Sequence, residues 1–188
     1  MPKQKITKEM VVDAAFALAR AGGMAQVMVK NIAEKLGCSV QPIYSYCKNM
    51  DGLRNDVEQQ AKRFVQKYIA EHINKENLFQ STGQAYIQLA REEPNILKLF
   101  IFQKRYNVSS MDELYQSETD PQMAGFISDT FNITLEKAKQ LHLDMLIYTI
   151  GIGTIFSVTQ PGIPAEEIYA QQDRVYQLFL KGIQENKI

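Results

Sequence analysis

A dozen residues, CSVQPIYSYCKN at positions 38–49, place many hydrogen-bonding side chains on one short segment. Gln41 carries an amide that donates and accepts at once, Tyr44 and Tyr46 carry hydroxyl groups, and Lys48 carries a positive charge. An amide of this kind can bind the edge of an adenine, and hydroxyl and ammonium groups can bind phosphate oxygens. The segment therefore has side chains suited to contact nucleic acid.

Two short helices are expected to position this segment. Apolar residues recur at helical spacing before Gly37, at Val29, Ile32, Ala33 and Leu36. A further helix fits residues 40–46, where Pro42 falls in the first turn and its missing N–H costs no bond within the helix. Two short helices joined by a glycine-containing turn are typical of a helix-turn-helix, whose second helix lies in the major groove of DNA.

The start of the second helix would face the bases. The residues placed there are Val40, Gln41, Pro42 and Ser45. Gln41 suits adenine N6 and N7, whereas Val40 and Pro42 offer only apolar contact, for instance with a thymine methyl group. The groups placed to bind phosphate are Tyr44, Tyr46 and Lys48. In the alternative reading, Tyr44 is a half-buried core aromatic, and Gln41 and Lys48 are simply solvated.

The rest of the chain also has helical periodicity, so the expected class is all-α. Thr7 can cap a first helix that ends at Gly22 and Gly23, and a long helix fits residues 50–72. Further helices fit residues 76–92, 95–105, 120–131, 134–158 and 165–186. Residues 107–120 are expected to form the least regular connection.

Charge is unevenly distributed along the 188 residues. Residues 1–70 hold eleven Lys and Arg against six Asp and Glu, giving +5, and residues 71–188 hold ten against fifteen, giving −5. A basic first part favours an anionic partner such as nucleic acid, with chance as the alternative. Two cysteines and a start without an apolar segment favour a cytoplasmic protein, and no transmembrane helix is expected.

The run from Val29 to Leu53, VKNIAEKLGCSVQPIYSYCKNMDGL, resembles the DNA-binding domain of the tetracycline-repressor (TetR-type) family. The resemblance includes the first helix, ITKEMVVDAAFALARAGG, the IAEKLG core, Tyr44 and the KN-x-x-x-L pattern at the start of the long helix. It implies a DNA-binding domain over residues 1–50 and an effector-binding and dimerisation domain over residues 51–188. The implied DNA contacts are Lys30, Val40, Gln41, Pro42, Tyr44, Ser45, Tyr46 and Lys48.

Three positions depart from the family pattern. Met28 stands where the family often has a capping Ser or Thr, and Cys47 stands where it usually has Phe. Met50 stands where a lysine is common. One fewer lysine–phosphate contact lowers the slope of the salt dependence by about one.

In this family the second domain dimerises and encloses an effector pocket. The resemblance therefore implies a homodimeric repressor of a palindromic operator. Binding of a small, largely apolar molecule is expected to release the repressor from the operator. Candidate pocket residues are Tyr86, Leu89, Phe100, Phe102, Tyr106, Phe126, His142, Met145 and Tyr148. Aromatic residues and Met at helical spacing also suit an ordinary core, which is the alternative.

Dimerisation is expected along the last two helices. Two helices from each protomer would form a four-helix interface. Gly151 costs its helix about 1 kcal/mol relative to Ala, a cost that is offset where two helices approach closely. The expected interface residues are Gly151, Ile155, Ile168, Val175, Leu178 and Phe179. The alternative is that the last helix packs only within its own chain.

Other classes of function find little support in the sequence. His72 and His142 belong to separate predicted helices, and no nucleophile, phosphate-loop or paired-carboxylate motif is present, so no catalytic, metal or cofactor site is expected. The alternative regulator is a thiol-based redox sensor that uses Cys38 and Cys47, which flank the second short helix. The competing interpretation of Cys47 is a small buried hydrophobe.

Overall fold

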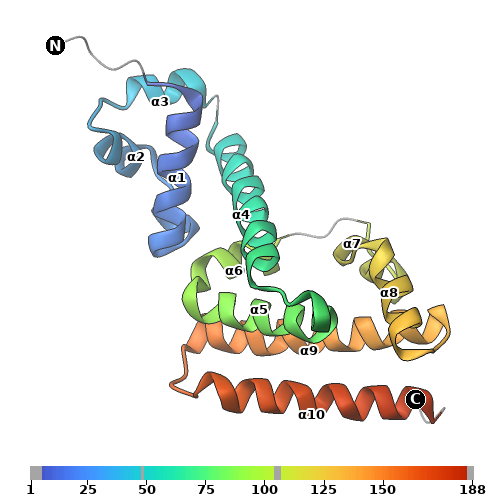
Figure 1. The fold of residues 1–188 in the computed structure, drawn as a ribbon. Coiled ribbons are helices and arrows are strands. Elements are labelled where there is room, and N and C mark those ends of the chain that lie inside the picture. The colour runs from blue at the N-terminus through green and yellow to red at the C-terminus, as the bar shows by residue number, and fades with distance from the viewer. Residues whose placement is uncertain (1–5, 48, 104–106, 186–188) are drawn as a thin grey trace. The chain divides into compact units, whose positions relative to one another are not determined.

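The computed structural model describes residues 6–47, 49–103 and 107–185, and over these residues the fold is helical, with 82% helix and no strand (Figure 1). The chain forms two compact units. The first comprises Met1–Glu71 and Glu92–Gln103, and the second comprises His72–Arg91 and Lys104–Ile188. The expected boundary at residue 50 therefore differs from the observed one, because most of the long helix and a later segment belong to the first unit.

The first unit is built from α1 (Lys8–Gly22), η1 (Met24–Gln26), α2 (Val29–Leu36), α3 (Gln41–Tyr46), α4 (Met50–His72) and α6 (Pro94–Ile101). The cap predicted for α1 is confirmed, since the Thr7 hydroxyl oxygen accepts from the Met10 amide at 3.2 Å. Gly37 ends α2 in the left-handed conformation, at φ 63°, which a residue without a Cβ adopts at little cost.

The core of the first unit lies where α1, α2, α3 and the start of α4 meet. Val11, Ile32, Ile43 and Val57 are fully buried there, and Leu53 is nearly so. These residues are the apolar stripes of their helices, so the periodicity in the sequence predicted which side of each helix turns inward.

The later segment, Glu92–Gln103, returns to the first unit through specific contacts with α1. The Glu93 carboxylate accepts from Arg20 Nε at 2.8 Å and also pairs with Arg20 Nη2, and Asn95 Nδ2 donates to the Arg20 carbonyl at 3.0 Å. Leu99 packs against the buried core of the unit. These contacts explain why α6 belongs to the first unit, although the chain has left that unit before α6 begins.

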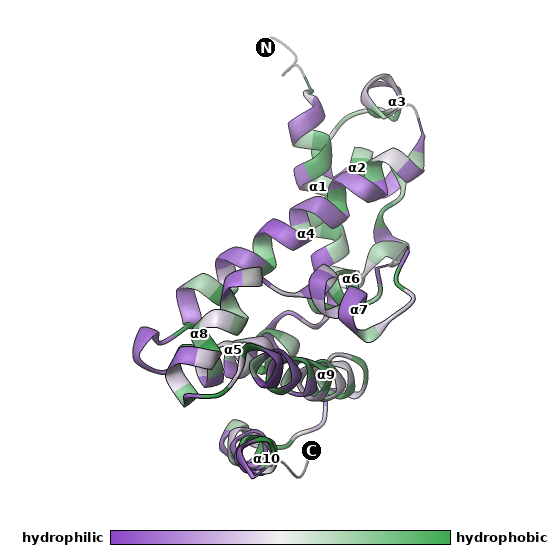
Figure 2. Ribbon diagram, turned by 90° about the vertical axis from the view of Figure 1, so that its right-hand side faces the viewer, coloured by the Kyte–Doolittle hydropathy of each residue, from purple (hydrophilic) through white to green (hydrophobic). Residues whose placement is uncertain are grey.

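The second unit is built from η2 (Lys75–Asn77), α5 (Leu78–Glu92), α7 (Met111–Glu118), α8 (Pro121–Phe131), α9 (Leu135–Thr159) and α10 (Ala165–Gln184). The long helices α9 and α10 run antiparallel, side by side (Figure 1), and Figure 2 shows that they carry residues of both hydropathy classes. Ile127, Leu141, Met145, Tyr176 and Ile183 form a buried core between α8, α9 and α10. This core supports one side of the pocket described below.

Helix α7 corrects a prediction, because residues 107–120 were expected to be irregular. Ser110 and Glu113 form a complete capping box: the Ser110 hydroxyl oxygen accepts from the Glu113 amide, and the Glu113 carboxylate accepts from the Ser110 amide. Tyr115, on the inner side of this helix, is buried. The S-x-x-E pattern that begins at Ser110 was a usable signal for the helix start.

Helix α9 bears on the expectation that the chain has no transmembrane helix. Among the described helices it is the one long and apolar enough, by length and composition, to cross a membrane. Its inner side packs in the core of the second unit, where Leu141, Met145 and Phe156 are buried. A core helix of a soluble protein passes the same test of length and hydropathy, so this finding is weak support for a membrane span.

Candidate functional site

Helix α3 presents one buried side and an otherwise exposed surface. Ile43 is fully buried and Cys47, at the C-terminal cap, is 8% exposed, and both belong to the core of the first unit. Tyr44 is 62% exposed, so its ring lies mostly in solvent. The alternative of a half-buried core residue at position 44 is therefore wrong.

Most of the predicted DNA contacts are exposed on α3 or at its N-terminal cap, and Lys30 is exposed on α2. The exposed members of the set are Lys30, Val40, Gln41, Tyr44, Ser45 and Tyr46. Pro42 is half-buried in the first turn of α3, and Lys48 lies outside the described residues. The Ser45 hydroxyl donates to the Gln41 carbonyl at 3.1 Å, which occupies its hydrogen but leaves its oxygen able to accept.

The helix ends near this surface are only partly capped. Met28 is exposed at the N-terminal cap of α2, and its side chain accepts no hydrogen bond. Since a Ser or Thr is common at this position in the resembled family, amide groups at the start of α2 here have no side-chain acceptor from the cap residue. The Asn49 side-chain oxygen, Oδ1, accepts from the Gly52 amide at 2.7 Å at the start of α4. Sequence reasoning missed this capping role of Asn49, although Asn before a helix is its usual signal.

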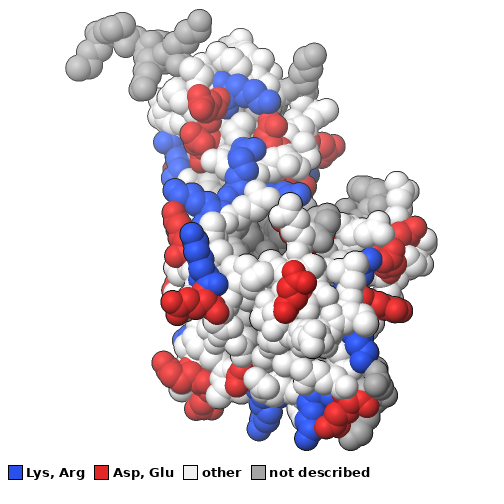
Figure 3. All heavy atoms as spheres, turned by 45° about the vertical axis from the view of Figure 1, so that its right-hand side comes forward, with Lys and Arg blue, Asp and Glu red and all other residues white. Residues whose placement is uncertain are grey.

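Charges of both signs surround the first unit, as Figure 3 shows for one face. Lys8 pairs with Asp56 at 2.9 Å, and Arg54 lies 3.6 Å from Asp51. The carboxylate of Asp51 is 89% exposed in the first turn of α4. An anion that approached this turn would meet that carboxylate, so the first turn of α4 is a poor place for an anion.

The cysteines occupy the core of the first unit, Cys47 as a buried residue and Cys38 as a half-buried one. Burial raises the pKa of the Cys47 thiol, with a smaller contribution from Asp56. A raised pKa reduces the thiolate fraction near neutral pH, whereas a redox sensor needs more thiolate. The observed environment of Cys47 supports its interpretation as a small hydrophobe.

We expect a thiol-specific reagent at pH 7.5 to modify Cys38 at least about tenfold faster than Cys47, because burial limits both access to Cys47 and its thiolate fraction. Mass spectrometry of peptides from a time course measures both rates. Denatured protein, in which both thiols are exposed, is the control. Equal rates in the folded protein would restore the redox-sensing alternative.

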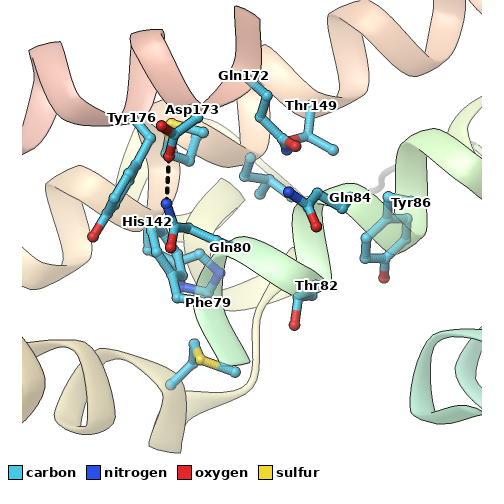
Figure 4. Close-up of a pocket in the computed structure, with 14 residues that line it drawn as sticks. Phe79, Gln80, Thr82, Gln84, Tyr86, His142, Thr149, Gln172, Asp173 and Tyr176 are labelled. Atoms are coloured by element: carbon cyan, nitrogen blue, oxygen red, sulfur yellow. Dashed lines mark hydrogen bonds between the residues drawn. The ribbon is translucent and has the colours of Figure 1, made fainter. Parts of the chain in front are cut away.

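The second unit contains a pocket between α5, α8, α9 and α10, drawn in Figure 4. Its lining atoms surround about 620 Å³ of space, counted out to the open mouth. The lining residues are Phe79, Gln80, Thr82, Gly83, Gln84, Tyr86, Met123, His142, Met145, Leu146, Thr149, Gln172, Asp173 and Tyr176. Aromatic and aliphatic groups with a few polar tips are typical of small-molecule sites.

Two polar pairs join the helices around the pocket. Gln80 Nε2 donates to the Asp173 carboxylate at 2.5 Å, and Gln172 Nε2 lies 3.4 Å from the Thr149 hydroxyl oxygen. Figure 4 shows the first pair on one side of the pocket and the second on the other. Gln172 and Thr149 are 4% and 8% exposed, whereas Asp173 is exposed, so the second pair forms the buried end.

His142 is held at the pocket wall by aromatic neighbours. Its Nδ1 lies 3.0 Å from the Tyr115 hydroxyl, and its ring meets the rings of Phe79 and Tyr115 edge to face, with centroids 5.7 and 5.4 Å away. Burial lowers the pKa of His142 to about 4, so the imidazole is neutral at pH 7. It can donate one hydrogen bond and accept one, but it brings no charge to the pocket.

Three of the predicted pocket residues line the observed pocket, namely Tyr86, His142 and Met145. The other described candidates do not line it: Leu89, Phe100, Phe102, Phe126 and Tyr148. Leu89 is fully buried, Tyr148 packs against the core of the second unit, and Phe126 is exposed on α8. Phe100 and Phe102 belong to the first unit, and Tyr106 lies outside the described residues.

Sequence reasoning missed the polar end of the pocket, although two signals were present. Gln172 interrupts the apolar stripe that α10 otherwise shows at Ile168, Tyr176 and Ile183. Gly83 lies inside α5, where glycine costs helix stability and so indicates a packing or functional requirement. Both residues lie at the buried end of the pocket.

A separate apolar stripe lies on the exposed side of α9. Ile147, Gly151, Ile155 and Val158 follow one another at helical spacing, and all four are exposed. A Cβ added to Gly151 would meet no atom within 4 Å, so this chain's own packing does not require a glycine there.

The predicted interface residues divide into two groups. Gly151, Ile155 and Leu178 are exposed, and Leu178 is the most exposed large hydrophobic residue among those that the structure describes. Ile168 is buried, while Val175 and Phe179 pack against the core of the second unit. These three residues pack within their own unit, so their interface role stays a prediction.

No group of three or more His, Cys, Asp and Glu side chains within the described ranges could hold a metal ion. No protein-family model matches the chain, and no curated protein is significantly similar to it.

Proposed function

We propose that the chain is a DNA-binding transcriptional regulator of the TetR type. In this proposal a cytoplasmic homodimer represses transcription at a palindromic operator and leaves it when a small, largely apolar molecule binds the second unit. The observation that carries the proposal is α3, a short helix anchored by Ile43, whose exposed surface carries Gln41, Tyr44, Ser45 and Tyr46. Hydrogen-bonding groups on an exposed second helix suit the major groove and its phosphates.

The order of elements supports the same proposal. Helices α2 and α3 are joined by a turn at Gly37, and α1 packs against both. This order of elements supports a helix-turn-helix in which α3 would be the recognition helix. Gln41 would then contact bases, while Tyr44, Tyr46, Lys30 and Lys48 would contact phosphates. The assignment rests on the residues and their exposure, together with the resemblance of Val29–Leu53 to the family.

A mobility-shift assay with DNA from beside the chain's own gene tests the proposal. We expect retardation of this fragment at nanomolar protein in about 150 mM salt, where specific complexes persist and non-specific ones are much weaker. An unrelated fragment of equal length is the control. Equal retardation of both fragments would show that the protein binds DNA without sequence specificity. Retardation of neither fragment would contradict the proposal.

The proposed dimer forms along the exposed stripe Ile147, Gly151, Ile155 and Val158 of α9. A glycine at the centre lets a second helix approach closely, and the flanking aliphatic side chains lose water on contact. A palindromic operator needs two copies of α3 at fixed spacing, so the proposed dimer also has a functional reason. Leu178 of α10 would lie at the edge of the contact.

We expect Ile155→Glu to raise the dimer dissociation constant at least about 100-fold, since two carboxylates would be placed in an apolar contact. Analytical ultracentrifugation over a range of concentrations measures this change. Leu135→Glu is the matched control, because Leu135 is equally exposed on α9 but lies away from the stripe. An unchanged dimer in the Ile155 variant would place the interface elsewhere.

A further inference from the structure

The charges around the pocket of the second unit limit what it can bind. Among the lining residues that the structure describes, Asp173 alone carries a formal charge at neutral pH, because burial keeps His142 neutral. The Asp173 carboxylate is exposed, and it already accepts a hydrogen bond from Gln80. An anionic ligand would find no cationic side chain among these residues. A cationic ligand would find its only counter-charge near the solvent and none at the buried end.

The buried end offers neutral hydrogen-bonding groups with unused capacity. The contact of 3.4 Å between Gln172 Nε2 and Thr149 is longer than an ordinary N–H···O bond. Gln172 therefore retains capacity both to donate and to accept, and Thr149 retains its hydroxyl hydrogen. Figure 4 shows Gln84 on the neighbouring turn of α5, close to this pair. A buried glutamine amide that is only weakly bound favours a ligand that completes its bonds.

Gly83 makes room for this amide. A Cβ built on Gly83 would lie 2.2 Å from Gln172 Nε2 and 3.5 Å from Thr149 Oγ1. Any larger residue at position 83 would therefore push the Gln172 amide away from its place against α5. Gly83 destabilises α5 relative to Ala at this position, but it allows the Gln172 amide to lie at the buried end of the pocket.

We propose that this pocket takes an uncharged, largely apolar molecule that carries one carboxamide or alcohol group, and that Gln172 and Thr149 hydrogen-bond to that group. Phe79, Tyr86 and Tyr176 contact the apolar remainder of the molecule. The inference rests on the proposed function for its biological role, since the ligand would be the effector, but binding to the pocket can be measured without DNA.

Two matched sets of probes test this inference on the full-length chain. One set is indole-3-acetamide, indole-3-acetate, tryptamine and 3-ethylindole, and the other is the phenyl series of the same four groups. At pH 7 each set offers a neutral polar, an anionic, a cationic and an apolar member on a common ring. Ligand-observed NMR titration gives the dissociation constants.

We expect the amide to bind at least about tenfold more tightly than the carboxylate and the amine, since a charge would lose water without a partner. We expect it to bind about three- to tenfold more tightly than the apolar member, which is the range of one neutral hydrogen bond. Gln172→Leu should abolish the difference in affinity between the amide and the apolar member. Gln177→Leu should preserve it, since Gln177 is an exposed glutamine on the same helix.

Gly83→Ala provides an independent variant, because alanine favours the helix while it displaces Gln172. We expect weaker amide binding with no loss of melting temperature. Three results would overturn the inference. The carboxylate or the amine could bind more tightly than the amide, or neither amide could bind. The preference for the amide could also persist in both variants. If the probes bind in the expected order of affinity but the protein does not retard DNA, the proposed function is contradicted and this inference about the pocket is not.

Discussion

The double variant Tyr44→Ala and Lys48→Ala is expected to bind the operator roughly 100- to 1,000-fold more weakly than the native protein. Each protomer of the proposed dimer would lose one hydroxyl contact and one ammonium contact with phosphate, so four contacts disappear together. The loss of one lysine per protomer should also make the plot of log affinity against log salt shallower by about two. Fluorescence anisotropy with a labelled operator at several salt concentrations measures both effects.

The matched control for this variant is Lys67→Ala. Lys67 is an exposed lysine on α4 that pairs with Glu71, and it lies outside the α3 surface. We expect its removal to leave the affinity within about threefold, since a surface ion pair contributes little. If the double variant bound the operator as tightly as this control, α3 would not be the DNA-contacting helix.

The second large effect concerns stability and pH. Burial lowers the pKa of His142 to about 4 from an unfolded value of 6.5, so between these values the unfolded chain binds more protons than the folded chain. His142 therefore lowers the free energy of unfolding as the pH falls from 6.5 toward 4. The full loss is about 3 kcal/mol at 1.36 kcal/mol per pKa unit. Denaturant unfolding at pH 7, 6, 5 and 4.5 measures it.

His142→Phe should remove this part of the pH dependence, because the replacement ring has no proton to bind. The variant also loses the contact with the Tyr115 hydroxyl, so its stability at pH 7 is expected to be lower by about 1–3 kcal/mol. His72→Gln is the control, since His72 is the other histidine of the chain and is exposed. A pH slope that is equal in the native protein and the His142 variant would show that burial of His142 does not control it.

Much of the helical structure followed from periodicity and caps. The long helix was predicted at residues 50–72, and α4 spans Met50–His72, because its apolar residues recur without interruption. The buried state of Cys47 also agrees with its position, where the resembled family usually has Phe. In contrast, α7 was missed because few of its residues are apolar, and only its capping box marked its start.

Contacts between distant segments could not be predicted from local pattern. Arg20 and Glu93 are 73 positions apart, and nothing near either residue indicates that they form a pair. The sequence located the apolar side of α10, but it could not show whether that side packs against a partner chain or against its own unit. Ile168 therefore seemed as suitable for an interface as Leu178, although one is buried and the other exposed.

The pocket shows the same limit. A Met or aromatic stripe has the same pattern in a core and at a cavity, so Leu89 and Met145 could not be separated by sequence alone. Which of them faces open space depends on how α5 packs against α9 and α10. The polar residue Gln172 and the glycine at position 83 were better signals, because each departs from what its helix would otherwise favour.

Footprinting of the purified protein on DNA from beside its gene tests the central claim most directly. The proposal predicts two protected half-sites of related sequence, in inverted orientation, separated by about one helical turn or a multiple of it. It also predicts that Gln41→Ala weakens protection at one base pair in each half-site, whereas Gln59→Ala, an exposed glutamine on α4, does not. Uniform protection without sequence preference, or no protection at all, would contradict the account.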